Sequence, residues 1–291
     1  MSVSNWFENF NNNLRMTTET VNSISYRYKR ITKQLNKDFW NYENEILNSL
    51  YVGSYGRGTE IHTSDIDMIM QLPYETYVKY NAYTNNGQSS LLQAVKSSVE
   101  RTYKPTYLRT DGQVIKLDFT DGINFEIVPA FINKDNSYTF PDANNGGHWK
   151  ITNPRPEIAE MTYANNNCNN NLKRLCRMGR AWKNNWNVPI GGLLIDTLAH
   201  NFLESYEFKD KSYLYYDLIS RDFFAFLKNQ KEDQQYCLAV GSKQHVEIKG
   251  NFQNKALKCY SISLEAIEKE NDYPTTAKTK WREIYGTQFP S

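Results

Sequence analysis

The sequence predicts an α+β protein, with a mixed sheet and helices in its amino-terminal half and a helical carboxyl-terminal lobe. Three successive patterns in the spacing of apolar residues predict this class. The spacing is helical before residue 50, alternates as in strands within short segments between residues 66 and 131, and is helical again after residue 172. A chain of 291 residues forms one large or two small domains. We expect two lobes, residues 1–155 and residues 156–291.

The elements of the first lobe follow from these periods in chain order. Residues 17–50 carry apolar side chains every three or four positions and no proline, which predicts a long helix. Residues 66–70 alternate as a strand, and residues 89–103 predict an amphipathic helix. Residues 114–119 and 124–131 predict two further strands that are joined by a tight turn.

The second lobe is introduced by a segment rich in Asn, Gly, Pro and Asp. This segment, residues 133–156, predicts a long loop. Helical spacing then predicts four helices, over residues 172–184, 192–206, 217–228 and 255–270. Residues 236–249 fit either a short strand or a loop.

Composition excludes several classes of protein. With 40% apolar and 23% charged residues the chain is an ordinary globular one, and its net charge of +2 argues against binding nucleic acid through bulk charge. Residues 1–10 lack the apolar core of a secretory signal, and the longest apolar run, residues 191–199, is too short to span a membrane. The 4 cysteines have neither zinc-site nor disulfide-framework spacing. We expect a cytoplasmic protein with no membrane partner.

The segment most informative about chemistry joins a glycine–serine step to two aspartates. Gly53 and Ser54 can bring backbone N–H groups and a hydroxyl close to a phosphate, whereas Arg57 fits either a phosphate contact or a surface turn. Asp65 and Asp67 are two positions apart on a predicted strand, so their carboxylates share a face. Two such anions repel unless a cation lies between them, and Mg²⁺ or Mn²⁺ suits hard oxygen ligands of this kind.

A third carboxylate is expected from a neighbouring strand. Glu126 is the first candidate, because its apolar neighbours face the core and leave its side chain on the opposite face; Asp118 is the alternative. Three carboxylates around two metal ions can activate an attacking hydroxyl and steady a leaving pyrophosphate. This pattern predicts nucleotidyl transfer.

These motifs resemble those of the DNA polymerase β-like nucleotidyltransferase superfamily. The resemblance extends to the bacterial cGAS/DncV-like nucleotidyltransferases (CD-NTases) of the CdnE-type clade, because the strand around Glu126 resembles the one that carries their third carboxylate. Further segments resemble the loop after that strand and the helical half of the clade: residues 140–142, 146–154, 172–182, 191–198, 221–224 and 280–286. The resemblance implies a polymerase β-like core with the active site in a cleft beside the helical lobe.

The resemblance also implies a function. Members of this family join nucleoside triphosphates into cyclic di- or trinucleotides, second messengers of bacterial anti-phage (CBASS) defence that act on a separate effector. By this resemblance Gly53 and Ser54 hold the triphosphate, and Asp65, Asp67 and Glu126 hold two Mg²⁺ ions. The third carboxylate is commonly Asp, so Glu126 is a departure that leaves room for a metal preference shifted toward Mn²⁺.

The prediction of which nucleotide base the protein uses depends on three residues, each of which fits more than one role. Arg180 and Trp182 resemble a pattern of pyrimidine-using relatives, which favours a uridine-containing product such as cyclic di-UMP or cyclic UMP-AMP. Arg180 equally fits a triphosphate contact, and Trp182 equally fits a core position. Asn153 can read a base edge or serve as a turn residue before the following proline.

Two other functions stay open at this point. One is a nucleotidyltransferase that modifies a protein, an RNA or a small-molecule acceptor. The other is a nucleotide-binding module without activity, which the three carboxylates argue against. The sequence contains neither an inserted zinc loop nor a long basic arm, so double-stranded DNA is not expected as a partner.

Overall fold

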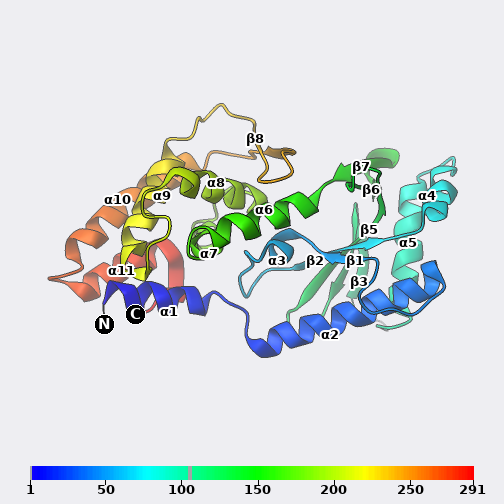
Figure 1. Cartoon of the computed structure of the whole chain (residues 1–291), viewed down its shortest axis with the longest axis horizontal. Coiled ribbons are helices and arrows are strands. Elements are labelled where there is room, and N and C mark those ends of the chain that lie inside the picture. The colour runs from blue at the N-terminus through cyan, green and yellow to red at the C-terminus, as the bar shows by residue number, and fades with distance from the viewer. Residues whose placement is uncertain (1, 104–106) are drawn as a thin grey trace. The chain divides into compact units, whose positions relative to one another are not determined.

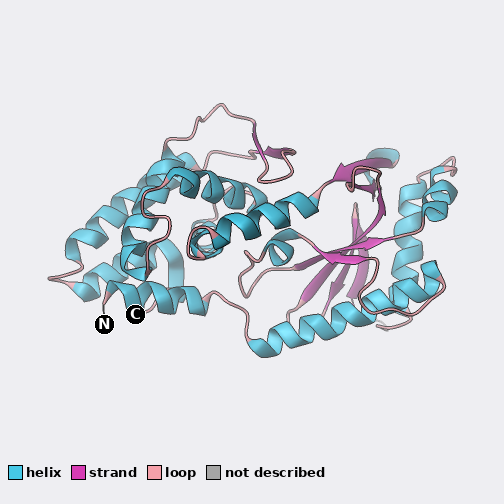
Figure 2. Ribbon diagram, in the orientation of Figure 1, coloured by secondary structure: helices cyan, strands magenta, loops and turns pink. Residues whose placement is uncertain are grey.

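The chain folds into two compact units in the computed structural model, which describes residues 2–103 and 107–291. The sheet unit comprises Met16–Gly56 and Thr63–Arg155, and the helical unit comprises Met1–Arg15, Arg57–His62 and Pro156–Ser291. Figure 2 shows the large sheet of the first unit and the mainly helical make-up of the second. One division between the units falls between residues 155 and 156, and the short segments Met1–Arg15 and Arg57–His62 lie in the helical unit.

A mixed sheet of 7 strands forms the centre of the sheet unit (Figure 1). Its order is β1-β2-β5-β4-β3, and β6 pairs with both β5 and β7. β2 pairs with β5 in parallel, whereas the other pairings of this sheet are antiparallel. The strands are β1 (Ser49–Tyr51), β2 (Ile66–Gln71), β3 (Tyr107–Asp111), β4 (Val114–Asp118), β5 (Asn124–Ile132), β6 (Tyr138–Asp142) and β7 (His148–Thr152).

Helices cover one face of this sheet and leave the other face polar near the start of β2. α2 and α5 pack on the strands through a core that includes Ile66, Met68 and Phe125. Because side chains alternate along a strand, Asp67 and Glu126 point away from this core. The helices of the unit are α2 (Thr18–Leu35), α4 (Tyr74–Asn81) and α5 (Gly87–Glu100), and α3 (Gly53–Arg57) begins in it.

The helical unit has a core of its own, which contains the fully buried Trp6, Trp182 and Trp281. Phe7 of α1 meets Trp281 edge to face with ring centroids 5.1 Å apart, which explains why the amino-terminal helix belongs to this unit. Its helices are α1 (Val3–Asn13), α6 (Pro154–Asn166), α7 (Asn171–Trp186), α8 (Gly192–Ser205), α9 (Tyr216–Lys228), α10 (Gln253–Lys269) and α11 (Pro274–Tyr285). β8 (Tyr236–Leu238) and β9 (His245–Glu247) form a small antiparallel sheet.

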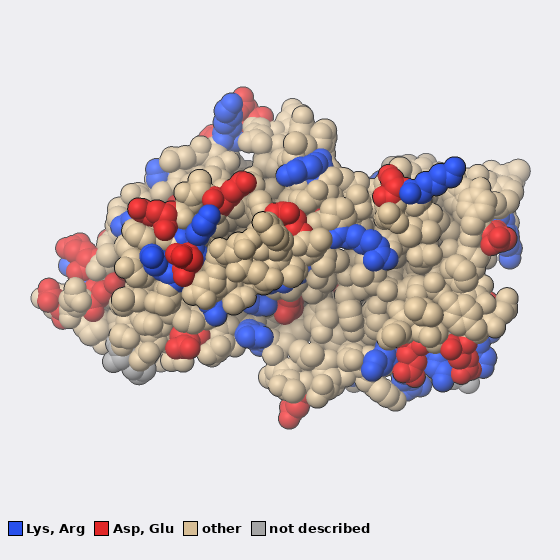
Figure 3. Space-filling model, in the orientation of Figure 1, with Lys and Arg blue, Asp and Glu red and all other residues tan. Residues whose placement is uncertain are grey.

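The surface carries mixed charge. On the face drawn in Figure 3, basic and acidic side chains are interspersed over a largely uncharged surface. Among the helices of the described residues, none has both the length and the apolar character needed to cross a membrane.

Most of the expected elements are confirmed, including β2, β4, β5, α5 and four helices of the helical unit. The long helix expected over residues 17–50 is wrong in its second half. α2 ends at Leu35, a π-helical turn ends at Trp40, and Asn41 then adopts a left-handed φ of 60° before β1 begins. Apolar spacing alone does not reveal where an Asn reverses the chain.

The long loop expected over residues 133–156 is also wrong. The chain there forms β6, β7 and the start of α6, and Pro141 is the register partner of Trp149. Most positions of β7 are exposed, so its sequence lacks the alternation that marks a half-buried strand. The Asn and Gly residues that suggested a loop occupy the short connection between the two strands.

Candidate active site

The polar face of the sheet brings the predicted carboxylates into one neighbourhood. Asp67 of β2 and Glu126 of β5 are Cα partners in the parallel pairing. Asp65, exposed and one residue before β2, accepts a hydrogen bond from Nδ2 of Asn124 at 3.2 Å. Side chains two positions apart share a face, so Asn124 and Glu126 tie Asp65 and Asp67 to the same side of β5. We call Asp65, Asp67 and Glu126 the acidic face.

The glycine of the Gly–Ser step lies directly against the acidic face. Gly53 has a φ of +60°, and a Cβ at this position would lie 1.8 Å from Oδ2 of Asp67. A residue with a side chain therefore fits only if Asp67 moves. The backbone next to it is fixed to β2, because the N–H of Val52 donates to the carbonyl oxygen of Asp67 at 2.9 Å. Ser54 follows in α3 and is half-buried.

Basic side chains of β3 and β4 flank the acidic face. Lys116 is the Cα partner of Glu126, and its Nζ lies 3.1 Å from Oε1 of Glu126 and 2.9 Å from Oδ2 of Asp111. The hydrogen bonds to Asp111 and Glu126 raise the pKa of Lys116, because both carboxylates favour its charged form. Asp118, the alternative third carboxylate, is ion-paired with Arg109.

The donor set of the acidic face fits a hard divalent cation. Carboxylate oxygens from adjacent strands are the ligands that Mg²⁺ and Mn²⁺ prefer, and Gly53 leaves the approach to Asp67 free of a side chain. Within residues 2–103 and 107–291, no three His, Cys, Asp or Glu side chains converge on one metal position. Lys116 already forms an ion pair with Glu126, so a metal ion shared by Glu126 and Asp67 would compete with this ammonium.

The candidate base readers of the helical unit are buried. Arg180 of α7 donates hydrogen bonds to both carboxylate oxygens of Asp196 in α8, at 2.6 and 3.0 Å. Trp182 is 0% exposed, and its ring lies 5.4 Å from that of Phe224, centroid to centroid. This burial argues against contacts with a base or a phosphate. It favours the core position that the sequence left open for Trp182, and a structural ion pair for Arg180. Asn153 lies between β7 and α6 in the sheet unit and is half-buried.

Asp196 is the centre of a buried ion-pair network that sequence reasoning missed. Nε of Arg57 donates to Asp196 at 2.8 Å, its NH1 lies 3.3 Å from Glu157, and the hydroxyl of Thr59 donates to Asp196 at 2.9 Å. Burial opposes ionisation of Asp196, but Arg180 and Arg57 outweigh it and hold the pKa of Asp196 well below its usual value. Arg57 is thus neither a surface turn residue nor exposed to phosphate. One feature of the sequence could have revealed this network. Asp196 lies within the apolar run 191–199, and a buried charge needs a partner of opposite charge.

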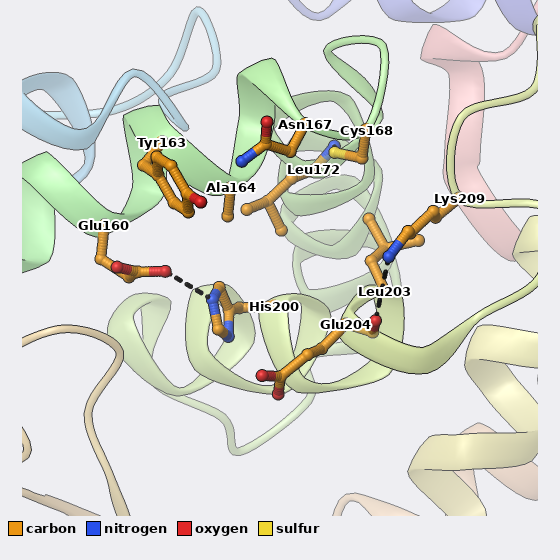
Figure 4. A pocket seen from close by; sticks show the side chains of 10 residues that line it. All are labelled: Glu160, Tyr163, Ala164, Asn167, Cys168, Leu172, His200, Leu203, Glu204 and Lys209. Carbon is orange, nitrogen blue, oxygen red and sulfur yellow. Dashed lines mark hydrogen bonds and ion pairs between the residues drawn. The ribbon is translucent and has the colours of Figure 1, made fainter.

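The pocket in Figure 4 lies elsewhere in the helical unit. It is an open pocket of about 180 Å³ between α6, α7 and α8. Nε2 of His200 lies 3.3 Å from Oε1 of Glu160 at its edge. The pocket contains none of the residues predicted from the sequence as site residues.

Comparison with known families gives a match over residues 1–165. This segment fits the model of SMODS, the Second Messenger Oligonucleotide or Dinucleotide Synthetase domain. Among curated proteins, a probable cyclic nucleotide synthase of Bacillus cereus (strain VD146) is 25% identical over 282 residues. The aligned region covers 82% of this chain and 81% of that protein.

Solved structures share the fold at low sequence identity. The Vibrio cholerae DncV cyclic AMP-GMP synthase is 12% identical, with a TM-score of 0.70 over 100% of this chain and 98% of that chain. CdnC of E. coli MS115-1, in a complex with HORMA-deltaN, is 13% identical with a TM-score of 0.69 over 96% and 95%. A STING-associated CdnE c-di-GMP synthase from Capnocytophaga granulosa is 16% identical with a TM-score of 0.59 over 86% and 81%. The fold is therefore that of the DncV and CdnC nucleotidyltransferases.

Proposed function

The chain belongs to the family of the Second Messenger Oligonucleotide or Dinucleotide Synthetase domain, and from this premise we propose that it joins nucleoside triphosphates into a cyclic oligonucleotide. The observation that carries the proposal is the acidic face, where Asp67 and Glu126 are register partners and Gly53 lies against Asp67. The likeness to a probable cyclic nucleotide synthase supports the same class of reaction.

In the proposed mechanism Asp65, Asp67 and Glu126 hold two divalent ions, Mg²⁺ or Mn²⁺. When bound, such ions favour deprotonation of an attacking ribose hydroxyl and neutralise charge on the leaving pyrophosphate. Gly53 lets backbone N–H groups approach the triphosphate, and the hydroxyl of Ser54 donates to a phosphate oxygen. Each transfer forms one phosphodiester bond and releases pyrophosphate, and an intramolecular transfer closes the ring.

The finer proposal is a cyclic dinucleotide that contains uridine, such as cyclic di-UMP or cyclic UMP-AMP. It is supported by the resemblance of residues 180–182 to the pattern of pyrimidine-using relatives. Since Arg180 and Trp182 are buried, we propose no direct contact of their side chains with a base, and Asn153 remains the candidate for such a contact. We also propose that the product acts on a separate effector in cytoplasmic anti-phage (CBASS) signalling, without double-stranded DNA as activator.

The test is an incubation of the purified protein with all four ribonucleoside triphosphates, one of them radiolabelled at a time, with Mg²⁺ or with Mn²⁺. Phosphatase treatment and chromatography then separate cyclic from linear products. A phosphatase-resistant product supports the proposal, and label from UTP supports the uridine preference. The Asp65→Asn/Asp67→Asn double variant should form no product while its circular dichroism spectrum is unchanged.

Two results would contradict the proposal. Product formation that persists in the double variant would put the catalytic site elsewhere. Label that appears only on an added protein, RNA or small-molecule acceptor would instead support the alternative of an acceptor-modifying nucleotidyltransferase.

A further inference from the structure

We propose that Lys116 competes with a divalent metal ion for the carboxylate of Glu126, and so sets the metal concentration at which the acidic face is loaded. The inference rests on the proposed function and deepens it, because it assigns a positioning residue to the same site. Lys116 acts through Glu126 and is not itself expected to touch the nucleotide.

The register of three adjacent strands carries the argument. Glu126 of β5 lies between Asp67 of β2 on one side and Lys116 of β4 on the other, each its direct Cα partner. The Nζ of Lys116 is 3.1 Å from Oε1 of Glu126, and both side chains are 26% exposed. Glu126 therefore has two alternative cationic partners, the ammonium on β4 or a metal ion shared with Asp67.

The two partners oppose each other on electrostatic grounds. An ammonium and a divalent ion on the same carboxylate repel strongly at such short range, so each weakens the binding of the other. Lys116 also has a second anion to turn to. Asp111 lies 2.9 Å from its Nζ, and the side chain of Asp111 is 60% exposed. The ammonium can therefore remain paired with Asp111 when Glu126 turns toward Asp67.

Direct metal binding tests the inference. Electron paramagnetic resonance of free Mn²⁺ would measure the affinity of the wild type, Lys116→Met and Lys116→Arg. We expect Lys116→Met to bind Mn²⁺ about fivefold more tightly than the wild type. This factor corresponds to about 1 kcal/mol, the free energy of a part-exposed ion pair. Lys116→Arg keeps the charge and should bind Mn²⁺ as the wild type does.

Lys96→Met is a matched control. Lys96 of α5 is 25% exposed and pairs with Glu100 at 2.9 Å, so this substitution removes the same charge and a similar ion pair away from the acidic face. It should leave the Mn²⁺ affinity unchanged.

Thermal stability gives a second measurement that does not depend on activity. In metal-free buffer Lys116→Met should melt at a lower temperature than Lys96→Met, because Glu126 then lies beside Asp67 without its ammonium partner. Adding Mn²⁺ should raise the melting temperature of Lys116→Met more than that of Lys96→Met. Adding Glu126→Gln to Lys116→Met should remove the deficit in metal-free buffer. A merely structural Lys116 would show the same deficit with and without Mn²⁺.

The outcomes separate this inference from the proposed function. If Lys116→Met binds Mn²⁺ no more tightly than Lys96→Met, Lys116 does not compete and the inference is overturned, even where the wild type makes a cyclic product. If the Asp65→Asn/Asp67→Asn variant binds Mn²⁺ as the wild type does, the acidic face is not the metal site and the proposed function fails with it.

Discussion

Two groups of charged residues in this molecule differ in how firmly their carboxylates are held. Asp196 of the helical unit is 0% exposed and accepts hydrogen bonds from Arg57, Thr59 and Arg180. Glu126 of the sheet unit is 26% exposed and is ion-paired with one ammonium, that of Lys116. The carboxylate of Asp196 therefore has all these partners within its own unit, whereas that of Glu126 can exchange its partner without disrupting the fold.

The difference separates charges that maintain a fold from charges that are available for chemistry. A buried carboxylate with several fixed donors has no capacity left for a ligand, and losing a partner leaves an uncompensated charge. A half-exposed carboxylate with one partner costs little to rearrange. The sequence does not distinguish a charged residue that maintains the fold from one that is available for chemistry. Only the partners of its side chain in the folded structure distinguish the two.

Asp196→Asn should have the largest effect on stability. The substitution leaves the guanidinium groups of Arg57 and Arg180 buried beside a neutral amide, and breaking a buried ion pair costs about 3–5 kcal/mol. Urea denaturation measures this loss in the free energy of unfolding. Asp65→Asn, at an exposed carboxylate, is the control and should change it by less than about 0.5 kcal/mol. Equal losses in both variants would show that the buried carboxylate stabilises the fold no more than the exposed one.

Arg180→Ala tests whether a residue that the sequence left open as a base reader instead maintains the fold. Because Arg180 is bound to Asp196 and buried, we expect about 3 kcal/mol lower stability and a uniform loss of product with every nucleoside triphosphate. Melting curves and product analysis with each labelled nucleotide measure the two effects together. A changed base preference at an unchanged melting temperature would return Arg180 to the role of base reader.

Gly53→Ala tests the close approach on the acidic face. The added Cβ would push Asp67 aside, and a displacement of about 1 Å at a reacting centre lowers the rate by about 100-fold. Gly122→Ala is the matched control, because Gly122 also has a positive φ, of +83°, but open space where the Cβ would lie. Both variants should lose about 1 kcal/mol from the left-handed backbone, and only Gly53→Ala should lose product. Equal product from the two variants would show that the contact with Asp67 is unimportant.

Glu270→Gln should have the smallest effect and one that depends on pH. Burial raises the pKa of Glu270 to about 8, and the nearby Asp217 adds to the rise, while a hydrogen bond from Trp281 opposes it. A raised folded-state pKa means that Glu270 favours the fold at low pH and that this contribution is lost as the pH rises toward 8. Solvent screening limits the gain in melting temperature to about 2 °C at pH 9, with no gain at pH 4.

Glu268→Gln is the control for this pH dependence. Its side chain, two residues earlier at the end of α10, is 72% exposed, so calorimetry should find the same melting temperature as the wild type at both pH values. A gain for Glu270→Gln that is equal at pH 4 and pH 9 would contradict the assignment of the effect to ionisation.

Local sequence patterns predicted the strands of the acidic face and the sides on which their residues lie. Alternation along residues 66–70 and 124–131 was sufficient, because one face of each strand is buried. The register of Asp67 with Glu126 and of Glu126 with Lys116 was not predictable, since it depends on which strands become neighbours. Lys116 was therefore missed, although it occupies a polar position of a predicted strand.

Other sequence patterns allowed two physical interpretations. Arg180 and Trp182 lie at helical spacing on α7, and this spacing does not tell a pocket wall from a core. The answer depended on Asp196, which lies on the next helix. The β6–β7 hairpin was missed because its composition is typical of a loop and its second strand is mostly exposed.

The parallel pairing of β2 with β5 has a consequence for the order of folding. Parallel strands need a long crossover, and here the chain between them includes α4, α5, β3 and β4. Asp67 and Glu126 therefore become neighbours only after this crossover has formed and β5 has docked, a contact of high sequence separation that forms slowly. During synthesis, a chain that ends before β5 contains the Gly–Ser step and both aspartates but not Glu126. The acidic face is therefore complete only once β5 has been synthesised and has paired with β2.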